Sequence, residues 1–195
     1  AVQHALNHNF WGIKLLGLKQ AKSIDNINEV LGLIEQQALD SSSTKVQSAA
    51  LRLLADQNNN SDYTAQFESA TQEKSLLLAG AGLYGLSQVD TAKALTIAPS
   101  FEKELPNVVA GLYSEYGGTD KNIFFKEMLN TTSNYDLYYA SAYYVKYLKN
   151  QKLSLLLDGV VVLEDALKNP KSWMVRVSKY RFNELKETIQ SMLKN

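Results

Sequence analysis

Residues 76–86, LLLAGAGLYGL, decide between two very different folds. They contain GAGLYG (80–85), which matches the G-x-G-x-x-G pattern of dinucleotide-binding loops. That pattern binds a pyrophosphate only where a β-strand precedes it and a helix opens inside it. The preceding residues, QEKSLLLA (72–79), are rich in helix formers and poor in β-branched residues. We therefore expect a helix whose glycines allow close helix contact, and strand content would be needed to support an NAD-binding enzyme instead.

Similar segments repeat along the chain at starts about 30 to 35 residues apart, which is the spacing of helical-hairpin solenoids. Each has small residues in its middle with Leu or Tyr beside them, and each is followed by a second helical stretch. The segments are WGIKLLGLKQA (11–21), KVQSAALRLLA (45–55), LLLAGAGLYGL (76–86) and LPNVVAGLYSEYG (105–117). They predict an all-α fold of HEAT/armadillo-like antiparallel hairpins in a right-handed α-superhelix, forming one domain over residues 1–195.

Apolar residues recur every three or four positions through most of the remaining chain, which is the helical period. Turn-forming stretches such as DQNNNSD (56–62) and YGGTD (116–120) separate these helical patterns. Only VVVL (160–163) has strand-like residues, and it lies within a helical pattern. Thr44 and Gln47 have the spacing of a capping box before one of the repeated segments.

Composition excludes several classes of function. Twenty basic and twenty acidic residues cancel, so no net charge favours nucleic acid or an anionic membrane. The chain has no cysteine, which excludes disulfides and thiolate chemistry but leaves the compartment open between cytoplasm and periplasm or exterior. No apolar run approaches a membrane span, and no signal peptide or initiator Met opens the sequence. We expect a soluble fragment of a longer protein.

The two histidines, His4 and His8, have the i, i+4 spacing with which a zinc-peptidase helix presents two ligands. Such a helix needs Glu directly after the first His, and that position holds Ala5. The chain has no third His or Cys to complete a ligand set. We therefore expect two exposed imidazoles and no metal site.

The segment YDLYYASAYYVKYL (135–148) contains six tyrosines that cover more than half of a helix circumference. Some of these rings should face the core, and others should face a groove or solvent, because tyrosine combines a large apolar area with a polar tip. The C-terminal residues 171–195 carry six basic against two acidic side chains, which favours a solvated helix face over a nucleic-acid site. The candidates for substrate contact are Arg52, Tyr139, Tyr143, Tyr147, Arg176 and Arg181. No catalytic set of residues is evident.

A family resemblance adds to this interpretation. The segment ALNHNFWGIKLLGLKQA (5–21) resembles the one that opens the C-terminal helical region in bacterial relatives of aminopeptidase N. Further similar segments are DSSSTKVQSAALRLLADQ (40–57), LYGLSQVDTAKAL (83–95) and SWMVRVSKYRFNELKETIQSML (172–193). The chain departs from the family pattern at His8, where relatives often carry Asp.

The resemblance implies that the parent protein is a zinc metallopeptidase that removes N-terminal residues from peptides. Its zinc ligands and catalytic residues would lie in an upstream domain, so no catalytic or metal-binding position transfers to this chain. The fragment itself would be a non-catalytic superhelical domain that packs on the N-terminal catalytic domain and encloses the peptide chamber. Peptide substrate and that domain would be its partners, with no nucleic acid or membrane. The alternative is a stand-alone HEAT-like scaffold that binds a protein or peptide.

Overall fold

The computed structural model describes residues 1–195 except 58–59, 132–133, 167, 169–172 and 195, and except the side chains of 131, 134–135, 173–178 and 181. All secondary structure in the described residues is helical, which confirms the all-α expectation and places 160–163 in a helix. The α-helices are α1 (Val2–Leu6), α2 (Trp11–Ala21), α3 (Leu31–Leu39), α4 (Thr44–Ala55), α5 (Thr64–Thr71), α6 (Leu76–Val89), α7 (Thr91–Ile97), α8 (Pro106–Tyr116), α9 (Asn122–Thr131), α10 (Asn134–Lys149), α11 (Leu153–Ala166) and α12 (Trp173–Met192). Short 3-10 helices are η1 (Ile27–Glu29), η2 (Asn60–Tyr63), η3 (Ala98–Phe101) and η4 (Thr119–Lys121).

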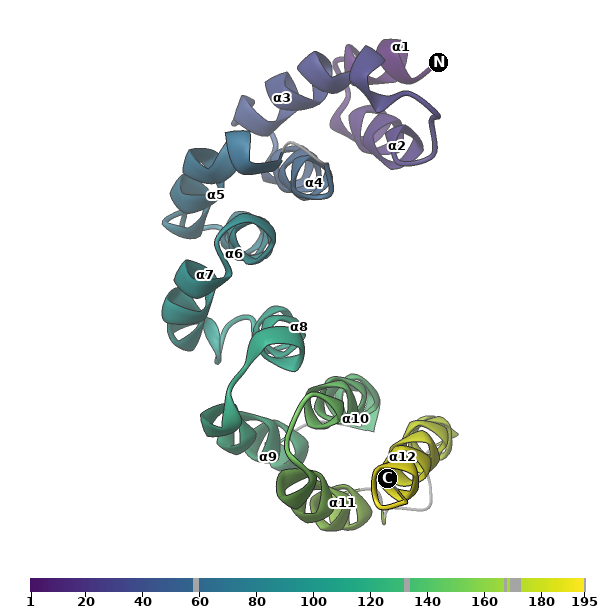
Figure 1. Ribbon diagram of the computed structural model, residues 1–195. Coiled ribbons are helices and arrows are strands. Elements are labelled where there is room, and N and C mark those ends of the chain that lie inside the picture. The colour runs from purple at the N-terminus through teal and green to yellow at the C-terminus, as the bar shows by residue number, and fades with distance from the viewer. Residues whose placement is uncertain (58–59, 132–133, 167, 169–172, 195) are drawn as a thin grey trace. The chain divides into compact units, whose positions relative to one another are not determined.

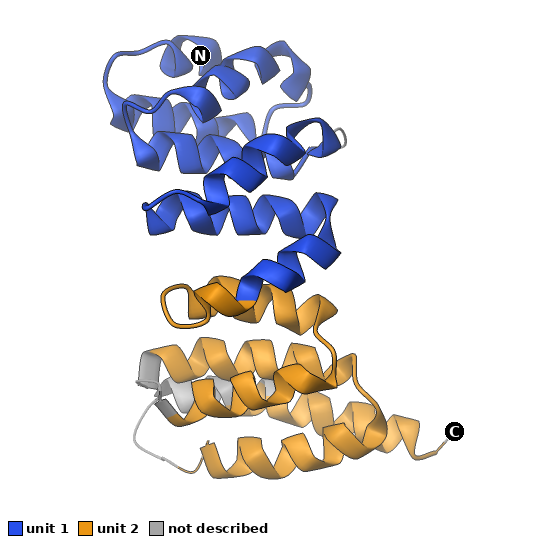
Figure 2. Cartoon of the chain, turned by 90° about the vertical axis from the view of Figure 1, so that its left-hand side faces the viewer, with its two compact units in different colours: residues 1–98 blue, residues 99–195 orange. Residues whose placement is uncertain are grey.

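The chain divides into two compact units, unit 1 (Ala1–Ala98) and unit 2 (Pro99–Asn195), which Figure 2 shows in blue and orange. The expectation of a single domain over 1–195 stays a prediction. Among the described residues, no helix is both long and apolar enough to span a membrane.

Unit 1 has two layers of helices (Figure 1). One layer contains α2, α4 and α6, with α4 packed between the other two, and the other layer contains α3, α5 and α7. The repeated segments 11–21, 45–55 and 76–86 are therefore the helices of one layer. Each is followed by a helix of the other layer, as the repeat pattern predicts.

Glycines set the distance between α5 and α6 in unit 1. A Cβ atom added at Gly82 would lie 2.5 Å from the backbone oxygen of Phe67, and one at Gly85 would lie 2.3 Å from the Phe67 ring. Both distances are far below van der Waals contact, so only glycine allows this approach. The glycines of GAGLYG therefore serve helix packing, as expected from the absence of a preceding strand signal.

Two helices of unit 1, α4 and α7, begin with side-chain caps of the ordinary kind. The Ser43 side chain accepts a hydrogen bond from the backbone N–H of Val46 at the start of α4. Thr44 is already the first residue of this helix, so the expected capping box from Thr44 to Gln47 is wrong by one position. Asp90 caps α7 in the same way, with its Oδ1 atom 3.0 Å from the backbone nitrogen of Lys93.

Unit 2 also has two layers, with α8, α10 and α12 in one and α9 and α11 in the other (Figure 1). Its core is aromatic. The ring of Phe125 lies 4.7 Å from that of Tyr147 and 5.6 Å from that of Tyr144, and all three side chains are fully buried. Tyr113, also fully buried, meets Phe124 edge to face at 5.2 Å. These contacts hold α8, α9 and α10 around one aromatic cluster.

Candidate functional site

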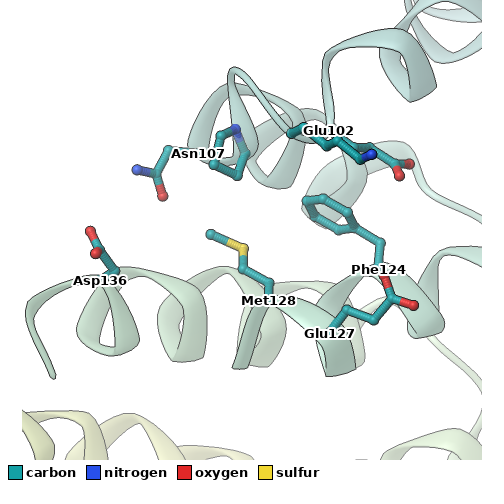
Figure 3. A pocket seen from close by; sticks show the side chains of 8 residues that line it. Glu102, Asn107, Phe124, Glu127, Met128 and Asp136 are labelled. Carbon is teal, nitrogen blue, oxygen red and sulfur yellow. The ribbon is translucent and has the colours of Figure 1, made fainter. Parts of the chain in front are cut away.

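A cleft of about 470 Å³ opens in unit 2 beside the starts of α8 and α10 and along α9 (Figure 3). We call it the α8–α9 cleft. Its lining residues combine apolar side chains with carboxylates, an amide and one amine. They are Glu102, Lys103, Pro106, Asn107, Phe124, Glu127, Met128 and Asp136.

The floor of the α8–α9 cleft is formed by α9. Phe124 and Met128 stand four residues apart, so they share one face of this helix. The Met128 side chain rises from α9 into the space between Phe124 on one side and Asn107 and Asp136 on the other (Figure 3). Met128 is buried and Phe124 is half-buried, so the floor is apolar and attached to the core.

Glu102 is held in place from inside the fold. The buried Tyr113 hydroxyl donates a hydrogen bond to Oε1 of Glu102 over 2.9 Å. Burial, and then the neighbouring carboxylate of Glu102, raise the pKa of Tyr113 well above its usual value. The phenol therefore stays protonated and remains a donor to Glu102 at physiological pH.

The charge of the cleft lining is negative. Three carboxylates, those of Glu102, Glu127 and Asp136, face one amine, that of Lys103. Asp136 lies in the first turn of α10, where a negative charge interacts favourably with the helix dipole. Among the described lining residues there is no hydroxyl, thiol or imidazole. The cleft lining therefore combines an apolar floor with an excess of carboxylates.

The residues expected to contact substrate lie in different units. Arg52 belongs to unit 1, where its guanidinium lies 5.4 Å from the ring centre of Tyr84. The Tyr84 hydroxyl donates to Oδ1 of Asp56 at 2.6 Å, and Lys22 lies 3.5 Å from the other carboxylate oxygen. Arg52 thus belongs to a partly exposed charged and aromatic group on α4 and α6.

The three expected tyrosines belong to α10 of unit 2 and differ in exposure. Tyr139 is exposed and meets Tyr138 edge to face, and Tyr143 is half-buried. Tyr147 is fully buried, and its hydroxyl donates to the Gly118 carbonyl at 2.9 Å. Burial, and then the charge of Asp120, raise the pKa of Tyr147 to about 12. Tyr147 therefore lies in the core and offers no surface to a ligand, in contrast to its expected position.

Arg176 and Arg181 lie in α12, and their side chains are outside the described residues. The structure accordingly places neither guanidinium.

The histidine pair does not share a helix. Helix α1 ends at Leu6, so His8 follows the helix that contains His4. Nδ1 of His8 accepts a hydrogen bond from the backbone N–H of Phe10 at 2.9 Å, just before α2 begins. His4 is exposed, whereas His8 is half-buried, so the expectation of two exposed imidazoles is wrong for His8. His8 supports the start of α2 in the way that a short polar side chain would.

The sequence interpretation missed the α8–α9 cleft. None of its lining residues is among the residues expected to contact substrate. The i, i+4 pair Phe124 and Met128 was visible as part of an apolar pattern, but such pairs ordinarily lie in the core. No known protein family, curated protein or solved structure matches this chain.

Proposed function

We propose that residues 1–195 form a non-catalytic helical domain of an aminopeptidase N-like zinc metallopeptidase. In this proposal the helix pairs are HEAT-like and stack in a right-handed superhelix. The domain packs on a catalytic domain outside these residues and contributes to the wall of its peptide chamber. The zinc and the catalytic side chains belong to that other domain.

The observation that carries the proposal is the repetition of helix pairs. The repeated segments, including two that resemble the aminopeptidase region, are α2, α4 and α6 in one layer of unit 1. Each of them leads into a helix of the second layer. Stacked helix pairs of this kind present a continuous row of helices, which suits a surface that faces an extended peptide.

An exposed apolar surface on α2 supports the packing role. Phe10, Trp11 and Leu16 are 55%, 43% and 58% exposed, although α2 has few polar residues to face water. Lys45 lies 4.9 Å above the Trp11 ring. A helix that is apolar all round is ordinarily buried, so the exposed apolar side chains at α2 suit a contact surface. In our proposal this surface of α2 contacts the catalytic domain.

The first experiment assays the 195-residue chain with aminoacyl-p-nitroanilides in the presence of zinc. We expect no turnover and no tight stoichiometric zinc, since the described residues contain no group of three His, Cys, Asp or Glu side chains that could hold a metal ion. Genuine turnover would overturn the proposal. The reading frame upstream of Ala1 provides a second test, in which an H-E-x-x-H segment is expected.

The docking role is tested by Leu16→Ser in the complete protein, with Leu39→Ser as the matched control. Both leucines are exposed in unit 1, at 58% and 69%. Loss of the contact should lower the thermal stability of the complete protein for Leu16→Ser and leave the isolated chain unchanged. Equal effects of the two substitutions would argue against a contact at α2.

The second candidate function is a stand-alone helical scaffold that binds a peptide. The α8–α9 cleft favours it, since its volume and mixed lining suit part of a peptide without any catalytic domain. A start codon directly before residue 1 would support this alternative over the peptidase domain.

A further inference from the structure

We propose that one exposed face of α4 and α6 in unit 1 binds an extended, acidic peptide segment. This surface, the α4–α6 face, consists of Lys45 and Arg52 of α4 together with Leu77 and Tyr84 of α6. The inference rests on the peptide-facing role proposed for this layer of helices, and it adds the charge of the peptide. It concerns binding by unit 1 and is tested without peptidase activity, so it can fail while the non-catalytic role holds.

The residues of the α4–α6 face are brought together by helix spacing and by a contact between the two helices. Lys45 and Arg52 are seven residues apart in α4, which is close to two turns, so they share one side of that helix. Leu77 and Tyr84 have the same spacing in α6. The two helices lie side by side in one layer of unit 1 (Figure 1). The Ser48 hydroxyl of α4 donates to the backbone oxygen of Leu77 at 3.0 Å, which holds the helices against each other.

The two cations lie over aromatic rings on opposite sides of α4. The Lys45 ammonium lies 4.9 Å from the ring centre of Trp11 in α2. The Arg52 guanidinium lies 5.4 Å from the ring centre of Tyr84 in α6. Because this side of α4 reaches both neighbours in its own layer, it is turned away from the second layer. A ring face attracts a cation but leaves its N–H groups able to donate to a carboxylate.

The cations of the α4–α6 face have no carboxylate partner in the part of the chain that the structure describes. Neither Lys45 nor Arg52 forms an ion pair there. The neighbouring carboxylate of Asp56 has both oxygens engaged. Its Oδ1 accepts from the Tyr84 hydroxyl at 2.6 Å, and its Oδ2 lies 3.5 Å from the Lys22 ammonium. A ligand carboxylate can therefore form charge-assisted hydrogen bonds with Arg52 or Lys45.

An extended acidic peptide fits this surface better than a nucleic acid does. Lys45 and Arg52 lie toward opposite neighbours of α4, so a ligand that contacts both must lie across the helix. Leu77 is 51% exposed beside them and offers an apolar contact to a peptide side chain. A nucleic acid is bound by a longer stripe of cations that follows its phosphates. Two separated cations with an exposed leucine therefore favour a peptide that contains both acidic and apolar residues.

The test follows the arginine side chains of the 195-residue chain by ¹⁵N NMR. The chain has three arginines, Arg52, Arg176 and Arg181, and an Arg52→Lys variant identifies the Arg52 signal by its loss. The probe is the peptide acetyl-Glu-Leu-Glu-Leu-Glu-amide, and its matched partner has Gln in place of each Glu. We expect a saturable shift of the Arg52 Nε–H signal with the acidic peptide and several-fold weaker binding of the Gln peptide. Equal binding of the two peptides, or no shift at Arg52, would overturn the inference.

The other two arginines serve as internal controls. Arg176 and Arg181 belong to α12 of unit 2, whereas the α4–α6 face belongs to unit 1. Their signals should not follow the saturation curve of Arg52. Equal shifts of all three signals would show only a general charge effect and would contradict a specific site.

A variant tests the second cation. Lys45→Gln should weaken the acidic peptide about two- to fivefold, the range of one exposed ion pair, as read from the Arg52 signal. Lys93→Gln is the matched control, because Lys93 lies in α7 of the second layer and pairs with Glu68. The control should bind the peptide with unchanged affinity. An equal loss in both variants, or no loss in Lys45→Gln, would contradict the α4–α6 face.

An octathymidylate distinguishes a peptide site from a nucleic-acid site. Weaker binding of the oligonucleotide than of the acidic peptide supports the inference, and tighter binding overturns it in favour of nucleic acid. Failure of the acidic peptide refutes the inference but not the non-catalytic role of the chain, which the zinc and turnover assays measure. The two proposals therefore fail in different experiments.

Discussion

Helices α5 and α6 of unit 1 pack in a different way from α8, α9 and α10 of unit 2, although the same degenerate repeat runs through both units. In unit 1, Gly82 and Gly85 remove side chains from α6, so that Phe67 of α5 reaches its backbone. In unit 2 the corresponding space between α8, α9 and α10 is filled by aromatic rings, among them Phe125, Tyr144 and Tyr147. The repeat pattern thus specifies that helices pair, while the size of the facing side chains determines how closely they do so.

The tyrosine hydroxyls bond to carboxylates in unit 1, and to a carboxylate, an amide and a backbone carbonyl in unit 2. In unit 1, Tyr63 donates to Glu35 and Tyr84 to Asp56, both across helices to carboxylates. In unit 2, Tyr147 donates to the backbone carbonyl of Gly118, in the connection between α8 and α9. Gln151 donates to Gly117 of the same connection at 3.2 Å. The core of unit 2 therefore also fixes the connection between α8 and α9. A glycine contact cannot do this, because glycine has no side chain to donate a hydrogen bond.

Removing one ring from the aromatic core should have the largest effect. Tyr147→Ala leaves a cavity beside Phe125 and frees the Gly118 carbonyl, so we expect a loss of about 3–5 kcal/mol in the free energy of unfolding. Urea denaturation measures the loss, and hydrogen-exchange mass spectrometry should locate it in residues 99–195. Tyr139→Ala on the same helix is the control, with a much smaller effect because Tyr139 is exposed. Equal losses would mean that the aromatic core does not hold unit 2 together.

The second-largest loss of stability should come from adding one methyl group in unit 1. Gly82→Ala places a Cβ atom 2.5 Å from the Phe67 backbone oxygen, where no side-chain rotation can relieve the clash. We expect a loss of about 1–3 kcal/mol. Gly32→Ala is the control in α3, because its Cβ position has no atom within 4 Å apart from the neighbouring backbone of its own helix. It should stabilise unit 1 by about 0.5 kcal/mol through helix propensity. A neutral Gly82→Ala would show that α5 and α6 can separate freely.

Alkali should affect the aromatic core. Tyr147 has its pKa raised to about 12, so its neutral phenol contributes stability that is complete below about pH 10 and lost as pH rises towards 12. Burial raises the pKa of Tyr144 as well. We expect unit 2 to lose of order 1 kcal/mol between pH 8 and pH 11. Tyr144→Phe/Tyr147→Phe should show a smaller loss over this range. An unchanged slope in the double variant would contradict the assignment.

Lowering the pH should have the smallest effect on stability, and this effect should arise in unit 1. Hydrogen bonds from Ser42 and then the Lys14 ammonium lower the pKa of Asp40 to about 2. Its ionised form therefore contributes stability that is present above about pH 4 and is lost as pH falls towards 2. Asp40→Asn should lower the free energy of unfolding by about 0.5 kcal/mol at pH 7. It should also reduce the loss of stability that unit 1 shows as the pH falls from 4 to 2. Asp25→Asn, at an exposed position of the same unit, is the control and should leave this low-pH loss of stability unchanged.

Local pattern was enough to predict the helices, and less was predictable about the site. GAGLYG could be assigned to a helix because the residues before it have no strand character. Tyr147 was expected at a surface, since six tyrosines on one helix cannot be sorted by periodicity alone. The α8–α9 cleft was not predicted, because Glu102 and Asp136 come from segments that only the folding of unit 2 brings to the same opening.

The sequence by itself determined the all-α class, the helix pairs and the need for close contact at Gly82 and Gly85. These follow from the spacing of apolar residues and from the missing side chain of glycine, which are properties of the chain. The tertiary structure decided which tyrosines are buried, which loop Tyr147 holds, and which carboxylates share a cleft with Met128. Those outcomes depend on how side chains far apart in sequence share space and hydrogen-bond partners, which no local pattern contains.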